Sequence, residues 1–161
     1  MYCNLEPKSM RLAVASDHAG FDLKGELKPW LTSLGHELTD LGAYQLDADD
    51  DYPDFALAVA QSVKEGKTDR GIVICGSGVG ACVTANKVVG IRACLCHDTY
   101  SSRQGVEHDD MNVICLGGRI IGVDLAKDIL LAFLAANFLP EPRFRRRLDK
   151  ILEVEKNQST S

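Results

Sequence analysis

Five short runs of apolar and β-branched residues recur along the chain, and a stretch with helical periodicity separates each run from the next. The predicted strands are residues 11–16, 37–40, 71–75, 92–96 and 112–116. The predicted helices are residues 23–34, 55–65, 79–87, 100–107, 123–134 and 143–155. Alternation at this spacing is typical of right-handed βαβ units, which build a parallel sheet with helices on both faces. The sequence therefore predicts an α/β fold around a five-stranded parallel sheet.

The chain is long enough for one domain and shows no sign of a second. Its 161 residues are 45% hydrophobic, which suffices for a single buried core. We expect one domain over residues 1–161, with a core of about 11–155 and frayed ends near Met1 and Ser161. No apolar run approaches the roughly 18 residues of a membrane span, and residues 1–10 lack the hydrophobic stretch of a signal peptide. A membrane partner is not expected.

Charge is distributed unevenly along the chain. The net charge is −5, yet residues 141–161 carry six Lys or Arg against four Asp or Glu. A small basic patch on an acidic protein favours a small anionic ligand and argues against a nucleic-acid partner.

The six cysteines lie mostly in apolar segments and show no paired CxxC spacing. They are Cys3, Cys75, Cys82, Cys94, Cys96 and Cys115. This usage predicts reduced thiols, and hence a cytoplasmic location, rather than a disulfide framework.

One segment, Cys75-Gly-Ser-Gly-Val-Gly80, places three alternating glycines between a predicted strand and a predicted helix. Glycine allows positive φ and lets the backbone approach a ligand closely. Amides freed in a turn at the start of a helix form a concavity that binds anions. A cysteine at the rim of that concavity faces the same positive field. The segment therefore predicts a place where an anionic oxygen is held beside a sulfur that can transfer protons.

Polar residues flank other predicted strands. Asp17 and His18 follow the first strand, Arg119 follows the fifth, and His108 lies between the fourth and fifth. In open parallel sheets, ligands bind at the carboxyl ends of the strands. We therefore expect these groups to converge with Cys75 on one rim of the sheet.

Competing motifs fail on their spacing. A dinucleotide fingerprint requires G-x-G-x-x-G, but the chain has G-x-G-x-G after its third strand, and a P-loop would require Gly-Lys-Ser/Thr where Gly80-Ala81-Cys82 stands. A cysteine phosphatase would need arginine at Ala81, and a thioredoxin-like motif would need cysteine at Gly78. What remains is a cysteine that transfers protons beside an anion-binding turn.

Between about Arg11 and Glu155 the chain carries the motifs Ser-Asp17-His18-Ala-Gly-Phe, Asp51-Tyr52-Pro53, Ile-Cys75-Gly-Ser-Gly-Val-Gly80, Ala85-Asn86-Lys87, Gly90-Ile-Arg92-Ala, His108-Asp-Asp-Met-Asn112 and Gly118-Arg119. In this order they resemble the ribose-5-phosphate isomerase B family of sugar-phosphate isomerases, which includes galactose-6-phosphate isomerase subunits. The resemblance implies a Rossmann-like three-layer α/β/α sandwich with an extended C-terminal helix. It also implies homodimers, sometimes paired into tetramers, that share active sites at the subunit interface and need no metal or cofactor.

The same resemblance implies an aldose–ketose isomerase that moves a proton between C1 and C2 of a phosphorylated sugar through a cis-enediolate. Ribose 5-phosphate and ribulose 5-phosphate are the leading pair. Cys75 matches the base, the Ser77 hydroxyl would assist the oxyanion, and His108 would open the sugar ring. The residues implied to bind substrate are Asp17, His18, Tyr52, Gly76, Gly78, Val79, Gly80, Asp109, Arg119, Arg143 and Arg147.

Three arginines match the phosphate-binding positions of the family: Arg119, Arg143 and Arg147, with His18 assisting. Arg143 and Arg147 are four residues apart and share one helix face. In the family these two reach the site of the neighbouring subunit, and their planar guanidinium groups suit phosphate oxygens.

Two departures from the family pattern bear on the choice of sugar. Asp109 stands where asparagine is usual, and Phe144 replaces a histidine common between the two C-terminal arginines. Isomerisation of a tetrose, allose or galactose phosphate therefore stays open as an alternative. A non-catalytic sugar-phosphate-binding protein and, third, a nucleotide-dependent oxidoreductase are the alternatives from other classes.

Overall fold

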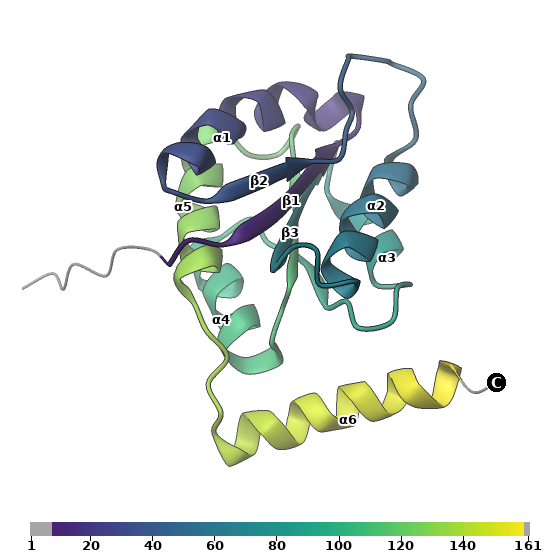
Figure 1. Ribbon diagram of the computed structural model, residues 1–161, viewed down its shortest axis with the longest axis vertical. Helices are drawn as coiled ribbons and strands as arrows, with labels where there is room; N and C mark the ends of the chain where they lie inside the picture. The colour runs from purple at the N-terminus through teal and green to yellow at the C-terminus, as the bar shows by residue number, and fades with distance from the viewer. Residues whose placement is uncertain (1–7, 160–161) are drawn as a thin grey trace, which may run out of the picture.

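In a computed structural model of the chain, five parallel strands form the central sheet in the order β2-β1-β3-β5-β4. Figure 1 labels β2, β1 and β3, which lie side by side. The strands are β1 (Arg11–Ser16), β2 (Glu37–Asp40), β3 (Arg70–Cys75), β4 (Ala93–Leu95) and β5 (Val113–Gly117). The helices are η1 (His18–Gly20), α1 (Phe21–Ser33), α2 (Tyr52–Lys64), α3 (Val79–Ala85), α4 (Thr99–Asp109), α5 (Val123–Ala135) and α6 (Pro142–Ser159). The structure describes residues 8–159, so Cys3 and the predicted fraying of both ends lie outside it.

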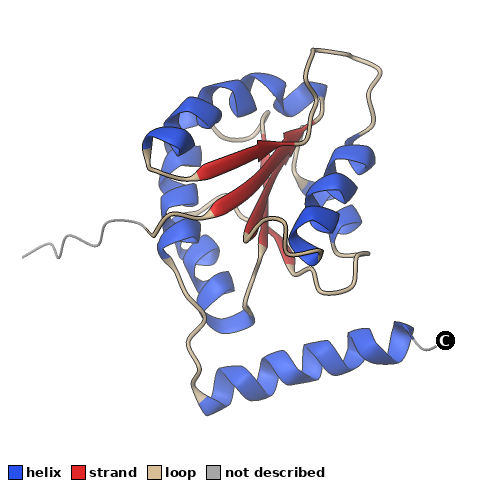
Figure 2. Cartoon of the chain, in the orientation of Figure 1, coloured by secondary structure: helices blue, strands red, loops and turns tan. Residues whose placement is uncertain are grey.

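Alternate residues of each strand supply two separate cores. Leu12 and Val14 of β1 pack with α1, α4 and α5 on one face, whereas Ala13 and Ala15 pack with α2 and α3 on the other. Figure 2 shows the resulting helix–sheet–helix layers. The predicted three-layer α/β/α sandwich with a five-stranded parallel sheet is confirmed.

Several element boundaries differ from the predicted ones. Helix α2 begins at Tyr52, three residues early, because Pro53 is well suited to the first turn of a helix. Helix α3 ends at Ala85, two residues early, because the N–H groups of Lys87 and Val88 donate to carbonyls three residues back and not four. The side chain of the next residue, Asn86, bonds to Ala93. Its amide accepts a hydrogen bond from the Ala93 N–H (2.9 Å) and donates one to the Ala93 carbonyl (2.8 Å). This side chain links the end of α3 to the start of β4.

Helix α6 extends four residues beyond its predicted end and stands apart from the other layers, on the side of the amino ends of the strands. Phe144 and Leu148 are its buried residues and face α4, and the Leu139 N–H before it donates to the Glu107 carbonyl (2.9 Å). Within residues 8–159, no helix combines the length and apolarity needed to cross a membrane.

Arg70 closes the carboxyl end of helix α5, which has no glycine cap. Its guanidinium donates to the carbonyls of Phe133 and Ala136, the latter at 2.7 Å. We predict that Arg70→Met lowers the free energy of unfolding by about 2–3 kcal/mol, because these two carbonyls then lose their charged hydrogen-bond donor. Urea unfolding at one fixed protein concentration measures the loss. The exposed Arg103→Met is the control, and an equal loss there would contradict the prediction.

Candidate active site

A cleft opens at the carboxyl ends of β1 and β3, which are neighbours in the sheet. The helices that follow these strands, α1 and α3, cover opposite faces, so a crevice forms between them. The cleft measures about 370 Å³ and we call it the rim cleft. It is lined by Asp17, Tyr52, Cys75, Gly76, Ser77, Gly80, Arg119 and Ile120. All but Ile120 are residues that the sequence had singled out.

The turn after β3 directs a backbone donor at the Cys75 sulfur. The Gly78 N–H donates to Cys75 Sγ at 3.1 Å, and the Val79 N–H donates to Ser77 Oγ at 3.3 Å. Gly78 has φ 81°, and a Cβ there would lie 2.9 Å from the Leu116 carbonyl carbon. Only glycine fits this position. Two of the amides expected to hold an external oxyanion are therefore engaged within the turn.

Tyr52 forms one wall of the rim cleft because Gly80 has no side chain. A Cβ on Gly80 would lie 2.5 Å from the Tyr52 ring. The ring therefore rests directly on the first turn of α3, with 40% of the residue exposed. This places a phenol beside the cysteine-containing turn.

The loops after β1 and β5 complete the rim. Asp17 is buried and its Oδ1 accepts from the Ala19 N–H (3.0 Å) and the Gly20 N–H (3.1 Å), which caps the short helix η1. The Arg119 N–H donates to the Gly76 carbonyl at 3.0 Å. This backbone hydrogen bond holds the Cα of Arg119, whose side chain is exposed, beside the turn that follows Cys75.

His18 has a partner that the sequence did not reveal. Its ring Nδ1 lies 2.7 Å from Asp50 Oδ1, and its backbone N–H donates to the same oxygen at 3.0 Å. The hydrogen bond to Asp50 raises the pKa of His18 above its usual value, against the opposing effect of desolvation. Asp50 belongs to the acidic run of residues 47–51, whose composition is typical of a solvated turn, so no sequence signal identified it.

Asp17, His18 and Asp50 have potential metal-ligand atoms within 4.8 Å of one another. However, His18 and Asp50 bond to each other, and one Asp17 oxygen already accepts two backbone amides. The arrangement works as an ion pair and a helix cap without a metal ion. The expectation of a metal-free site stays a prediction.

His108 does not lie at the rim, and the expectation that it would is wrong for a single chain. Helix α4 begins after the carboxyl end of β4 and returns to the amino end of β5. Its last turn therefore lies at the amino ends of the strands, away from the rim cleft. There the His108 ring stacks on Phe144, with centroids 3.9 Å apart and planes 17° apart. Asp109 lines a separate cavity at this edge, together with Arg92 and Ile151.

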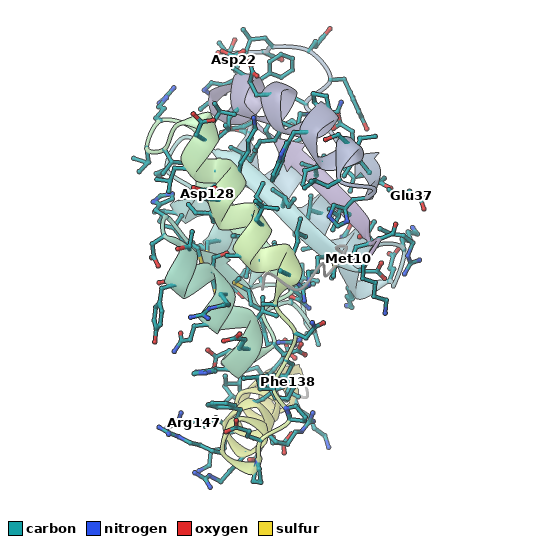
Figure 3. All side chains as sticks on the ribbon, turned by 90° about the vertical axis from the view of Figure 1, so that its left-hand side faces the viewer. Met10, Asp22, Glu37, Asp128, Phe138 and Arg147 are labelled. Carbon is teal, nitrogen blue, oxygen red and sulfur yellow. The ribbon has the colours of Figure 1, made fainter. Side chains whose placement is uncertain are left out.

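Arg143 and Arg147 also lie away from the rim cleft, exposed on α6. In Figure 3, Arg147 lies at the opposite end of the molecule from Asp22, which follows η1 closely in the chain. The predicted site residues therefore form two groups, one at the carboxyl ends of the strands and the other at their amino ends. We call the second group the α4–α6 face, which comprises His108, Asp109, Arg143 and Arg147.

Comparison with known proteins supports a single family. The family described as Ribose/Galactose Isomerase matches residues 12–151. The D-erythrulose-4-phosphate isomerase of Pectobacterium atrosepticum is 43% identical, over 80% of this chain and 85% of its own length.

Two solved structures are also similar. The ribose-5-phosphate isomerase B of Clostridium thermocellum has a TM-score of 0.89 and 46% identity, covering 92% of this chain and 99% of its own. The ribose-5-phosphate isomerase B of Mycoplasma genitalium with bound ribulose-5-phosphate has a TM-score of 0.86 and 42% identity, covering 91% of this chain and 96% of its own.

Proposed function

Because the chain belongs to the ribose/galactose isomerase family and is an aldose–ketose isomerase, we propose that it interconverts ribose 5-phosphate and ribulose 5-phosphate. The observation that carries this proposal is the rim cleft, where Cys75, Ser77 and Arg119 line one pocket. A proton-transferring sulfur, a hydroxyl and a fixed cation are the groups that isomerisation of a sugar phosphate requires.

In the proposed mechanism, Cys75 removes the proton from C2 of the open-chain aldose. The electron pair of that C–H bond forms the C1–C2 double bond, and the carbonyl oxygen on C1 becomes the oxyanion of the cis-enediolate. The Ser77 hydroxyl and amides of the turn other than those of Gly78 and Val79 stabilise this charge. Cys75 then returns the proton to C1, and the hydroxyl proton on O2 moves to O1, which leaves a ketone at C2.

We propose that a second copy of the chain completes each site. His108 would open the furanose ring, and Arg143 and Arg147 would bind the phosphate, yet all three lie on the α4–α6 face. A homodimer, alone or paired into a tetramer, would bring the α4–α6 face of one copy to the rim cleft of the other. Arg119 and His18 contribute the phosphate contacts from the rim side.

Turnover on a panel of phosphorylated sugars tests the substrate: ribose 5-phosphate, D-erythrulose 4-phosphate, allose 6-phosphate and galactose 6-phosphate. We expect ribose 5-phosphate to have the highest kcat/KM, without added metal or cofactor. A higher kcat/KM on another sugar would overturn the assignment of the substrate and leave the reaction class intact.

Asp109→Asn should raise kcat/KM for ribose 5-phosphate by about fivefold or more. The amide removes a charge that repels the enediolate, and at contact distance that repulsion is worth about 1 kcal/mol even in water. The amide can also donate a hydrogen bond, which an ionised carboxylate cannot. The control is Asp22→Asn, an exposed carboxylate in the first turn of α1. If both variants behave like the parent, Asp109 does not face the sugar.

A further inference from the structure

The loop between β2 and α2, residues 41–51, is fastened to the end of β1. The Ser16 N–H donates to the Gly42 carbonyl (2.8 Å), and the Ala43 N–H donates to the Ser16 carbonyl (2.7 Å). The buried Lys24 ammonium adds a hydrogen bond to the Ala43 carbonyl at 2.6 Å. The first part of the loop is therefore held against the strand that leads into Asp17 and His18.

Asp50, near the end of this loop, directs its carboxylate at a single residue, His18. Its Oδ1 accepts from both the backbone N–H and the ring of His18. Its side chain is only 10% exposed, and its Oδ2 is buried with no hydrogen-bond partner within residues 8–159. A buried carboxylate oxygen without a partner costs free energy, and such groups often belong to functional sites.

Three charged groups influence the His18 ring: the carboxylates of Asp17 and Asp50, and the guanidinium of Arg119. Asp17 and Asp50 favour the charged imidazolium, Asp50 mainly through its hydrogen bond, whereas Arg119 is near enough to disfavour it. Two positive groups held side by side repel each other until an anion lies between them. Arg119 lines the rim cleft, so the anion that would relieve this repulsion is one bound there.

We propose that Asp50 is a positioning residue for anion binding: its carboxylate accepts the Nδ1–H of the doubly protonated His18 ring and so directs the second donor, Nε2–H, to a phosphate beside Arg119. While Nδ1–H bonds to Asp50, Nε2 carries a hydrogen only in the charged imidazolium, and the Asp50 carboxylate favours that form. That this phosphate belongs to a sugar substrate rests on the proposed function. The role of Asp50 in anion binding does not rest on the proposed function, because it is argued from the contacts of His18 alone.

The probe is inorganic phosphate, titrated into the full-length protein at about pH 7.5 while the His18 ring is followed by NMR. Asp50→Asn keeps an oxygen for the His18 backbone N–H but loses the charge. We expect the His18 pKa to fall toward its ordinary value of about 6.5 and the Kd for phosphate to rise about tenfold. In turnover assays the loss should appear in KM and be largest between the ordinary histidine pKa of about 6.5 and the raised pKa of His18 in the parent, because only the variant has then lost the charge on that ring.

Asp49→Asn is the matched control, since it removes the same charge from an exposed neighbour in the same loop. An equal loss of phosphate affinity in Asp49→Asn, or an unchanged His18 pKa in Asp50→Asn, would overturn the proposal. On a His18→Gln background, Asp50→Asn should have no further effect on phosphate affinity. A persistent effect there would show that Asp50 does not act through His18. If the NMR results hold but ribose 5-phosphate is not turned over, the proposed function fails and the role of Asp50 stands.

Discussion

Cys75→Ala is expected to reduce kcat for ribose 5-phosphate by about 10³-fold or more, because a positioned acid–base group contributes roughly that factor to a proton transfer. Cys75 ends β3 at the floor of the rim cleft, with the Gly78 N–H 3.1 Å from its sulfur. Phosphate affinity should be nearly unchanged, since the proposed phosphate contacts come from arginine and histidine side chains. Steady-state kinetics and a phosphate titration of the same preparation separate the two properties.

Cys82→Ala is the control for the loss of a thiol. The hydrogen bond of Cys82 with Cys115 lowers the pKa of Cys82 to about 6, so thiol reagents would modify it readily. Inactivation by an alkylating agent alone would therefore not identify Cys75. Cys82 is absent from the lining of the rim cleft, and its alanine variant should keep the parent activity. If Cys75→Ala also keeps that activity, Cys75 is not the base.

Mixing two impaired variants should raise activity, measured well below the KM of the variants, when their defects lie at opposite ends of the strands. Cys75→Ala damages the rim cleft, and Arg147→Ala damages the α4–α6 face. In a dimer of one chain of each kind, one of the two composite sites has every residue intact. After unfolding and refolding of an equal mixture, random pairing predicts about a quarter of the parent activity.

A pair of variants with defects at the same edge provides the control. Cys75→Ala mixed with Arg119→Ala leaves every rim cleft damaged, so refolding together should give no gain over the separately refolded samples. The proposal of shared sites fails if the first pair shows no gain, or if both pairs gain equally. Size-exclusion chromatography of the mixtures establishes that the chains have paired in each case.

The rim could be predicted from the sequence wherever a local signal marked the end of a strand. The glycines at positions 76, 78 and 80 identify the turn after β3, and at two of them an added Cβ would clash: with Leu95 and the Leu116 backbone at Gly78, and with the Tyr52 ring at Gly80. Asp17 and Arg119 follow apolar runs directly, so parallel strands bring them to the same edge. To predict these residues, it was enough to locate the strands from their apolar runs and to apply the rule that ligands bind at the carboxyl ends of strands in α/β sheets.

The position of His108 was predicted wrongly, although the rule that corrects it is simple. A residue that precedes a parallel strand lies at the amino end of that strand, and His108 precedes β5. Asp50 is a different case. It lies in an irregular loop of 11 residues whose path is set by contacts with β1 and Lys24, and no periodic pattern encodes such contacts. The length of α6 was underestimated because its polar last turn carries no stop signal.

The separation of the two groups of site residues has a consequence for gene duplication. In the proposed dimer, each copy needs its partner's α4–α6 face and supplies its own in return. After duplication, one gene can lose the residues of the rim cleft while the other loses those of the α4–α6 face. Neither loss alone abolishes activity in a dimer that contains one product of each gene. Once both losses have accumulated, each product is inactive alone, and selection preserves the two genes together. A family with this architecture can thus pass from a self-sufficient enzyme to an obligate pair of unlike subunits without any gain of function.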